Sequence, residues 1–272
     1  MSEKQYLYEI WKRQLPLHKR QETLELVTAV QEGDEEGMRS ALFRGAYSKV
    51  TVPTSGVGSR CLVGVAANRG HSHLLPILLR VGLNIEGEGT SGRSPLMETA
   101  LRGHTQTVKA LLTLGANALA TDTEGMTALH YAAQEGHQQC VAILIRVIPP
   151  FPLDIKNTPL HLASRSGRVE VMKQLADAGW PLTAVNRAGA TPLHWAAMGG
   201  SVVAAEWLVQ RCGNPLVKDN LGRTPLDIAV LFGCHEVETW LTKNGGSVVR
   251  REDQYRMMVV RLYNVCLATP GS

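Results

Sequence analysis

Thr191-Pro192-Leu193-His194 is the stretch that decides the fold, because this box recurs along the chain at a fixed interval. The same four residues stand 33 positions earlier as Thr158-Pro159-Leu160-His161, and related boxes begin at Ser94, Thr127 and Thr224. Each box suits the start of a helix. Thr or Ser can accept hydrogen bonds from unpaired backbone N–H groups, and proline is favoured at the first helical position, where no N–H partner is needed. The sequence therefore predicts five consecutive units that each open with a helix.

Glycines mark where the predicted helices end, because glycine adopts the left-handed conformation at a helix C-terminus without a steric penalty. A second apolar helix follows each first helix and leads to a hairpin tip, such as Asp219-Asn220-Leu221-Gly222. Two divergent units precede the first box, with helix starts near Leu24 and Cys61. The glycines that end the first helices are Gly33, Gly70, Gly103, Gly136, Gly167, Gly200 and Gly233.

The boxes, their spacing and the glycines together resemble the ankyrin repeat, a hairpin turn followed by two antiparallel helices. The resemblance implies an all-α ankyrin-repeat solenoid of about seven helix pairs with β-hairpin fingers. Terminal repeats cannot bury both faces, so we expect helical caps at both ends, over 2–15 and 253–267. We assign 1–23 to an N-terminal capping helix and linker, 24–256 to the repeat domain, and 257–272 to the end of the C-terminal cap and a tail.

Two segments depart from the repeat pattern. The stretch from Tyr47 to Arg60 is an insertion whose Pro53, Gly56 and Gly58 predict a flexible loop. The fourth repeat ends in Ile148-Pro149-Pro150-Phe151-Pro152, where the others have a glycine turn. We interpret this segment as a structural irregularity, with partner contact by Phe151 as the alternative.

Neither composition nor motifs indicate catalysis. The nine histidines fall mostly on box and corner positions, without metal-ligand spacing, so no metal or other cofactor is expected. In the family the box histidine commonly bonds between neighbouring turns. The five cysteines are scattered, which favours reduced thiols and a cytoplasmic chain, with nuclear entry left open. No run approaches 18 apolar residues, so no membrane insertion is expected.

The resemblance implies a non-catalytic scaffold or adaptor that binds another protein on its concave face and is monomeric by itself. Carrying the family's contact positions over to this sequence gives the candidate partner-binding residues. They are Arg69, Arg93, Leu101, Arg102, Met126, Arg165, Arg187, Trp195, Met198, Leu221, Arg223, Leu231 and Phe232.

Two features of this set predict the ligand. Arginine recurs along the expected groove, and apolar residues gather at its C-terminal end (Met198, Leu221, Leu231, Phe232), which favours a partner segment with acidic and apolar residues. Coverage of Leu231 and Phe232 by the last helix is the alternative. For function, the alternative is a nucleic-acid-associated or nuclear regulatory ankyrin protein that uses the arginine-rich groove, although the net charge of +4 is too small to favour nucleic acid.

Overall fold

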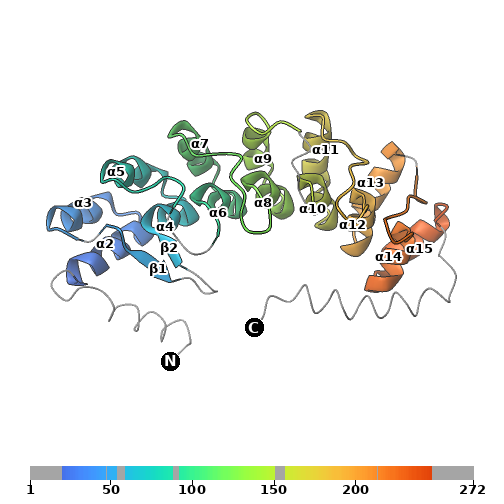
Figure 1. Cartoon of the computed structure of the whole chain (residues 1–272), viewed down its shortest axis with the longest axis horizontal. Coiled ribbons are helices and arrows are strands. Elements are labelled where there is room, and N and C mark those ends of the chain that lie inside the picture. Colours follow the sequence, from blue (N-terminus) through green and yellow to red (C-terminus); the bar gives the residue numbers. More distant parts are fainter. Residues whose placement is uncertain are drawn as a thin grey trace, which may run out of the picture. The chain divides into compact units, whose positions relative to one another are not determined.

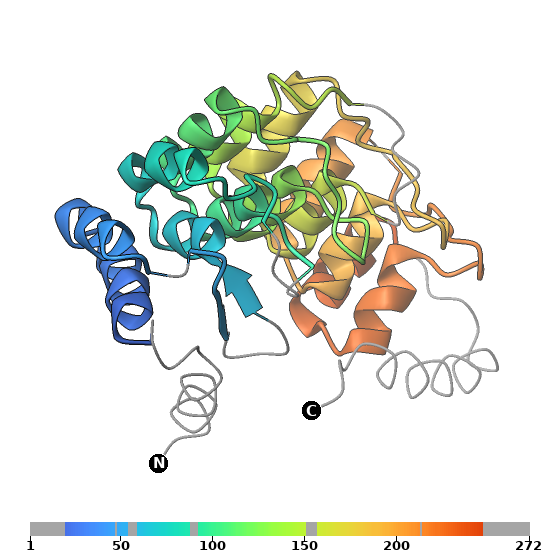
Figure 2. The same cartoon turned by 60° about the vertical axis from the view of Figure 1, so that its left-hand side comes forward.

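The computed structural model describes residues 20–46, 48–53, 59–87, 92–150, 157–212 and 214–246. In these ranges the chain forms fourteen α-helices, one short 3-10 helix and one two-stranded sheet (Figure 1). The helices follow one another as pairs, and Figure 2 shows the two members of a pair lying side by side. The predicted all-α repeat fold is confirmed. The expected caps at 2–15 and 253–267, and Phe151, lie outside the described residues.

Contacts divide the chain into two compact units. The first unit holds residues 1–132 and 139–148, and the second holds residues 133–138 and 149–272. The first contains α2 (Arg20–Glu32), α3 (Glu35–Phe43), α4 (Leu62–Arg69), η2 (Ser72–Leu74), α5 (Leu75–Arg80), α6 (Pro95–Arg102), α7 (Thr105–Thr113) and most of α8 (Ala128–Glu135) and α9 (Gln138–Leu144). The second contains α10 (Pro159–Arg165), α11 (Val169–Asp177), α12 (Pro192–Met198), α13 (Val202–Cys212), α14 (Pro225–Phe232) and α15 (His235–Lys243).

The boxes act as helix caps, as their residue types predict. Thr158 has extended backbone angles (φ −89°, ψ 161°), its side chain accepts a hydrogen bond from the His161 N–H, and proline follows at the helix start. Thr224 has the same role before α14, which ends at Gly233 in the left-handed conformation (φ 68°). These caps satisfy backbone groups that a helix leaves unpaired at its ends. The sequence signals for helix start and stop are therefore local and reliable here.

Two details of the first unit differ from the expectation. The first helix begins at Arg20, four residues before Leu24. The insertion is not simply a loop, because β1 (Thr51–Pro53) and β2 (Ser59–Cys61) pair as an antiparallel ribbon with Thr51 opposite Cys61. Backbone pairing of its two flanks satisfies polar groups that a free loop would leave to water. The prediction of a flexible loop is wrong for these flanks, and residues 54–58 lie outside the described ranges.

Small and branched apolar side chains fill the core between successive first helices. Alanine pairs such as Ala66-Ala67 and Ala196-Ala197 are fully buried and allow neighbouring helices to approach closely. The approach is closest at Gly199, where an added Cβ would lie 1.9 Å from the Arg165 carbonyl oxygen. Such spacing fixes the position of each helix end relative to the next, which in turn positions the surface residues described below.

Candidate partner-binding surfaces

The finger tips are held rigidly by one carboxylate or amide side chain each. Asp219 Oδ1 accepts hydrogen bonds from the backbone N–H groups of Leu221 and Arg223, both at 2.9 Å. Asp122 and Asn186 make the same pair of bonds in their own fingers. Side chains of this type commonly stabilise turns by bonding to the backbone two residues further on. A residue at the tip, such as Leu221, is therefore presented in a fixed position.

The box histidines connect each first helix to the finger of the next repeat. His161 Nδ1 accepts the Thr158 N–H (3.1 Å), and its Nε2 donates to the Ala190 carbonyl oxygen (2.9 Å). His194 repeats this pattern with Thr191 and the Arg223 carbonyl oxygen (3.0 Å). Because one ring nitrogen accepts and the other donates, the neutral ring fits the site. Burial lowers the pKa of His194, although the hydrogen bond to the Arg223 carbonyl acts in the opposite direction.

A second set of side chains connects each repeat to the one before it. His71 Nε2 donates to the Gln31 carbonyl oxygen and His104 Nε2 to that of Asn68, both at 3.0 Å. In the second unit, Arg168 Nε donates to the Gln134 carbonyl oxygen at 3.3 Å. The two histidines are therefore engaged in hydrogen bonds to backbone carbonyl groups. Among the described residues, no group of three or more His, Cys, Asp or Glu side chains is placed to hold a metal ion.

Arg93, the first predicted arginine with a side-chain contact, is engaged within its own unit. Its Nε donates to the Tyr131 hydroxyl at 2.9 Å, and its guanidinium carbon lies 4.7 Å from the Tyr131 ring centroid. The Tyr131 hydroxyl in turn donates to Asp122. Burial, followed by this bond to Asp122, raises the pKa of Tyr131 well above its usual range. Arg93 is exposed but anchored, so it is less available for a partner than the sequence indicated.

Arg223 and Met126 do not contribute free surface. Arg223 forms an ion pair with Asp219 at 2.7 Å, and its side chain is only 13% exposed. Met126 is 8% exposed, because its place just before the Thr127 box is packed into the repeat core. The expectation that Met126 contacts a partner is therefore corrected: its side chain lies inside the first unit. The predicted arginine stripe is also shorter than expected.

The other predicted residues retain exposed surface to different degrees. In the first unit Arg69 and Arg102 are exposed and Leu101 is half-buried. In the second unit Arg165 and Arg187 are exposed, whereas Trp195, Met198 and Leu231 are half-buried.

The second unit brings Arg165 and Trp195 together and exposes two apolar side chains. The Arg165 guanidinium carbon lies 5.8 Å from the Trp195 ring centroid, within cation–π range. Trp195 also meets the His161 ring edge-on, with centroids 5.9 Å apart. Leu221 is 65% exposed and Phe232 is 40% exposed. Within this unit, the predicted residues therefore supply a cation on an aromatic ring and two exposed apolar side chains.

Sequence reasoning missed a buried ion pair in the first unit. Glu98 is 1% exposed and both of its carboxylate oxygens accept from Arg60 Nη2 at 3.1 Å. Asn68 Nδ2 donates to the same carboxylate at 2.9 Å. The available signal was the residue type: Glu98 occupies the fifth box position, where the later boxes carry Tyr131, Leu162, Trp195 and Ile228.

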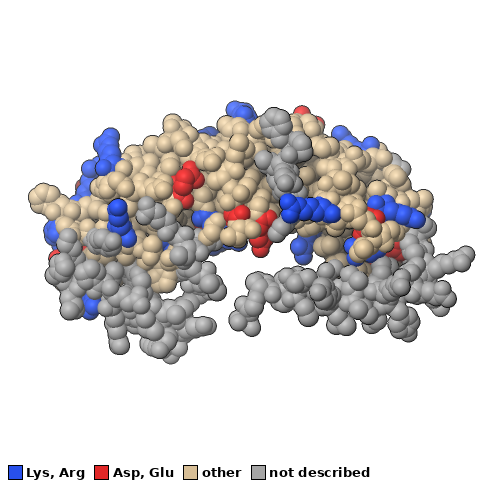
Figure 3. All heavy atoms as spheres, in the orientation of Figure 1, with Lys and Arg blue, Asp and Glu red and all other residues tan. Residues whose placement is uncertain are grey.

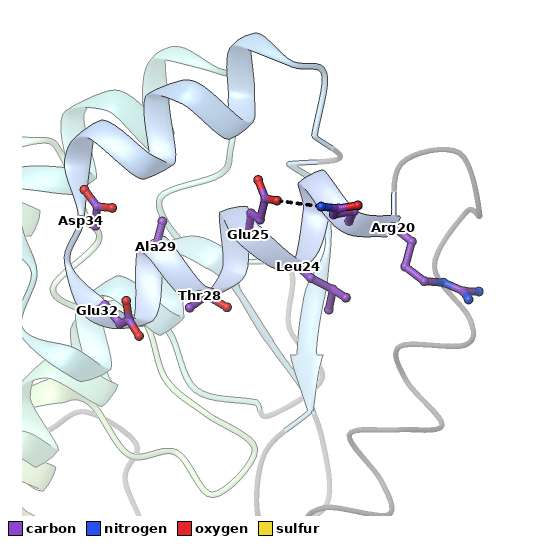
Figure 4. Close-up of a pocket in the computed structure, with 8 residues that line it drawn as sticks. Arg20, Leu24, Glu25, Thr28, Ala29, Glu32 and Asp34 are labelled. Carbon is purple, nitrogen blue, oxygen red and sulfur yellow. Dashed lines mark hydrogen bonds between the residues drawn. The ribbon is translucent and has the colours of Figure 1, made fainter.

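An open hollow lies along α2, and the side chains that line it do not form a catalytic arrangement. It is lined by Arg20, Gln21, Leu24, Glu25, Thr28, Ala29, Glu32 and Asp34 (Figure 4). Small-molecule sites usually enclose most of the ligand surface, which a hollow along one helix cannot do. Burial raises the pKa of the Cys140, Cys212 and Cys234 thiols, the opposite of the shift that activates a nucleophile.

Comparisons with known proteins agree with this geometry. Within the described ranges, no helix combines the length and the apolar character needed to cross a bilayer. A search of curated protein sequences gave no match. The crystal structure of the human ASB11 ankyrin repeat domain is 24% identical, covers 82% of this chain and 99% of that chain, and superposes with a TM-score of 0.68. This likeness concerns the fold. The family model of ankyrin repeats in three copies matches residues 62–151, 114–185 and 160–253, which is more than half of the sequence, and the chain therefore belongs to the ankyrin-repeat family.

Proposed function

We propose that this chain is a non-catalytic scaffold or adaptor whose second unit binds a segment of a partner protein. Ankyrin repeats are in general protein–protein interaction modules, and the family is generally non-enzymatic. The proposed surface consists of the exposed predicted residues of the second unit, Arg165, Arg187, Leu221 and Phe232, together with the half-buried Trp195. The expected ligand is a segment that combines apolar and acidic side chains.

The exposure of Leu221 on a rigid tip is the observation that carries this proposal. The side chain is 65% exposed, while Asp219 fixes the backbone on both sides of it through bonds of 2.9 Å. A pre-organised apolar side chain loses little conformational entropy on binding, so burial by a partner is more favourable than for a mobile residue. Phe232, an aromatic residue 40% exposed at the end of α14, has the character of a binding anchor.

The charged residues favour acidic groups in the ligand. Arg165 is exposed while its guanidinium lies over Trp195, an arrangement that orients the cation without burying it. An arginine held in this way presents a planar set of donors suited to a carboxylate. Nucleic acid is less well supported, because Arg93 and Arg223 are engaged with Tyr131 and Asp219.

Affinity capture from cell lysate with matched variants tests the proposal. The native chain is compared with Leu221→Asp/Phe232→Asp and with a control, Val203→Asp, whose residue is 63% exposed on α13. We expect partner proteins that are retained by the native chain and the control and lost from the double variant, with all three melting curves unchanged. Identical partner sets for all three chains would overturn the proposed site.

The same samples separate protein binding from nucleic-acid binding. Captured nucleic acid should be released steeply as salt increases, because its binding depends on counterion release. A protein segment held by Leu221 and Phe232 should remain largely bound at moderate salt, since burial of apolar surface depends little on ionic strength. Complete release of all partners by modest salt would favour the arginine-based alternative.

A further inference from the structure

We propose a second interaction surface, on the outer turns of the first unit, that binds an acidic amphipathic helix of another protein. It consists of Val81, Leu114 and Val147, which we call the outer-turn row. Their exposed fractions are 40%, 37% and 48%, respectively. All three belong to the first unit, and none belongs to the surface proposed above.

The members of the row occupy one recurring place in the repeat. Each lies where the second helix of a pair ends: Val81 follows α5, Leu114 follows α7, and Val147 stands in the turn after α9. Val81, Leu114 and Val147 are each 33 positions apart, and consecutive repeats stack on one another, so these side chains form a line.

The space around the row is open. The glycines that follow Val81 and Leu114, Gly82 and Gly115, have no atom within 4 Å of the place where a Cβ would stand. The fold does not require apolar residues here, because the second unit carries Ala178, Arg211 and Asn244 at the equivalent positions. Large apolar side chains aligned on an open surface of one unit and absent from the other indicate an interaction site.

The charged side chains of the helices and turns that carry the row are all basic. Arg80, Lys109 and Arg146 are exposed, and residues 72–83, 104–116 and 137–148, all within the described ranges, contain no Asp or Glu. The outer helices of the second unit differ, since α11, α13 and α15 carry Glu170, Glu206 and Glu236. Figure 3 shows blue and tan spheres along the upper edge over α5, without red ones. An acidic partner is favoured, and a second copy of this chain is not, because the two basic rows would repel each other.

The spacing of the row matches a helix. Neighbouring packed helices lie about 8–10 Å apart, so equivalent side chains of successive repeats are separated by a similar distance. A helical ligand rises about 1.5 Å per residue and covers that distance in roughly seven residues, or two turns, which returns to the same face. An extended strand would need about three residues per step and would turn alternate contacts away from the row. Apolar residues at seven-residue intervals flanked by Asp or Glu are therefore the expected ligand pattern.

Selection from a displayed library of random 22-residue peptides, panned on the full chain, tests this surface. Binding of each selected peptide is then measured by fluorescence anisotropy with the native chain and two variants. Val81→Asp/Leu114→Asp/Val147→Asp alters the row, and Ala178→Asp/Asn244→Asp alters the equivalent positions of the second unit. We expect acidic peptides with the seven-residue apolar pattern, at least about tenfold weaker binding to the row variant, and unchanged binding to the second variant.

A charge variant and two further probes complete the test. Arg80→Glu/Arg146→Glu changes only exposed arginines and should also weaken the same peptides at least about tenfold, even if the triple variant melts at a lower temperature. Peptides that lack acidic residues, or that bind the native chain and the charge variant equally, would overturn the proposal. The proposal would also be overturned if no such peptides were selected and the native chain instead bound phosphatidylserine vesicles, or associated with itself in sedimentation experiments. Leu221→Asp/Phe232→Asp should bind the selected peptides normally, which keeps this surface separate from the first.

Discussion

Replacing Arg60 or Glu98 singly will destabilise the first unit strongly, whereas replacing both will cost clearly less than the two single losses added together. The single variants are Glu98→Leu and Arg60→Met, which remove one charge each and keep most of the side-chain volume. In the native chain Glu98 accepts from Arg60 at 3.1 Å and from Asn68 at 2.9 Å while only 1% exposed. Each single change therefore leaves a charged group in a buried site without its opposite charge.

The magnitude follows from two independent arguments. Unit charges about 4 Å apart attract by about 4 kcal/mol at an effective dielectric constant near 20. Removal of one partner from a buried pair typically costs about 3–5 kcal/mol. The Arg60 side chain is 24% exposed, so water recovers part of its loss when Glu98 is replaced. We therefore expect about 3 kcal/mol for Glu98→Leu and more for Arg60→Met, which strands the buried carboxylate.

Urea unfolding followed by circular dichroism measures these effects, with hydrogen exchange of α4 and α6 to show that the loss is local. The double variant should be at least about 2 kcal/mol more stable than the sum of the single losses predicts, because it leaves no unpaired charge. The exposed pair Arg39–Glu35, with side chains 57% and 41% exposed, is the control, and Glu35→Ala should cost at most about 0.5 kcal/mol. Additive losses in the double variant would refute the view that Arg60 and Glu98 form one coupled pair.

Three further predictions concern packing, protonation and the tyrosine cluster. Gly199→Ala should cost about 1–3 kcal/mol in urea unfolding, because its Cβ would lie 1.9 Å from the Arg165 carbonyl oxygen. Gly64→Ala, whose nearest neighbour would be 3.5 Å away, should instead gain about 0.5–1 kcal/mol; a loss there, or none at Gly199, would contradict the packing argument. Burial lowers the pKa of His194 below its ordinary value of 6.5, so the unfolded chain binds the proton first as the pH falls. The free energy of unfolding should therefore decrease below about pH 6.5, and His194→Asn should reduce that slope between pH 7.5 and 5.5; an equal slope in both chains would assign it to other groups. Tyr131→Phe removes the hydroxyl shared by Arg93 and Asp122 and should cost about 1–3 kcal/mol, whereas an unchanged urea midpoint would show that water replaces it.

The parts of the fold that sequence could predict are those set by neighbouring residues. A cap joins Thr158 to His161, three positions away, and a glycine ends a helix through its own backbone angle. Both were readable from residue types. The start of α2 at Arg20 and the β1–β2 ribbon were not, since the first repeat lacks the box and the ribbon depends on pairing between Thr51 and Cys61.

The candidate site was harder to predict because exposure depends on the neighbouring repeat. Sequence placed Arg165 and Leu221 correctly among exposed residues, yet it gave Met126 the same status, although that side chain is 8% exposed. The position of a residue within the repeat predicts whether it lies on the side of the repeat that carries the fingers. Whether a side chain is covered depends on residues one repeat away, whose contacts a single repeat pattern does not specify.

The arginines show a rule that connects these observations. Arg60 and Arg93 each stand just before a helix-opening position, and each bonds to a residue 38 positions later, Glu98 and Tyr131 respectively. The partner in both pairs comes from the next repeat, so an arginine at this place stabilises the stacking of two repeats when that repeat supplies an acceptor. Arg223 occupies the same place in the last box and instead pairs with Asp219 of its own finger. Arg165, at the end of α10, lies outside this register and remains exposed over Trp195. Arginines before the box are therefore structural in this chain, whereas Arg165 at the end of a first helix and Arg187 on a finger are exposed to a partner.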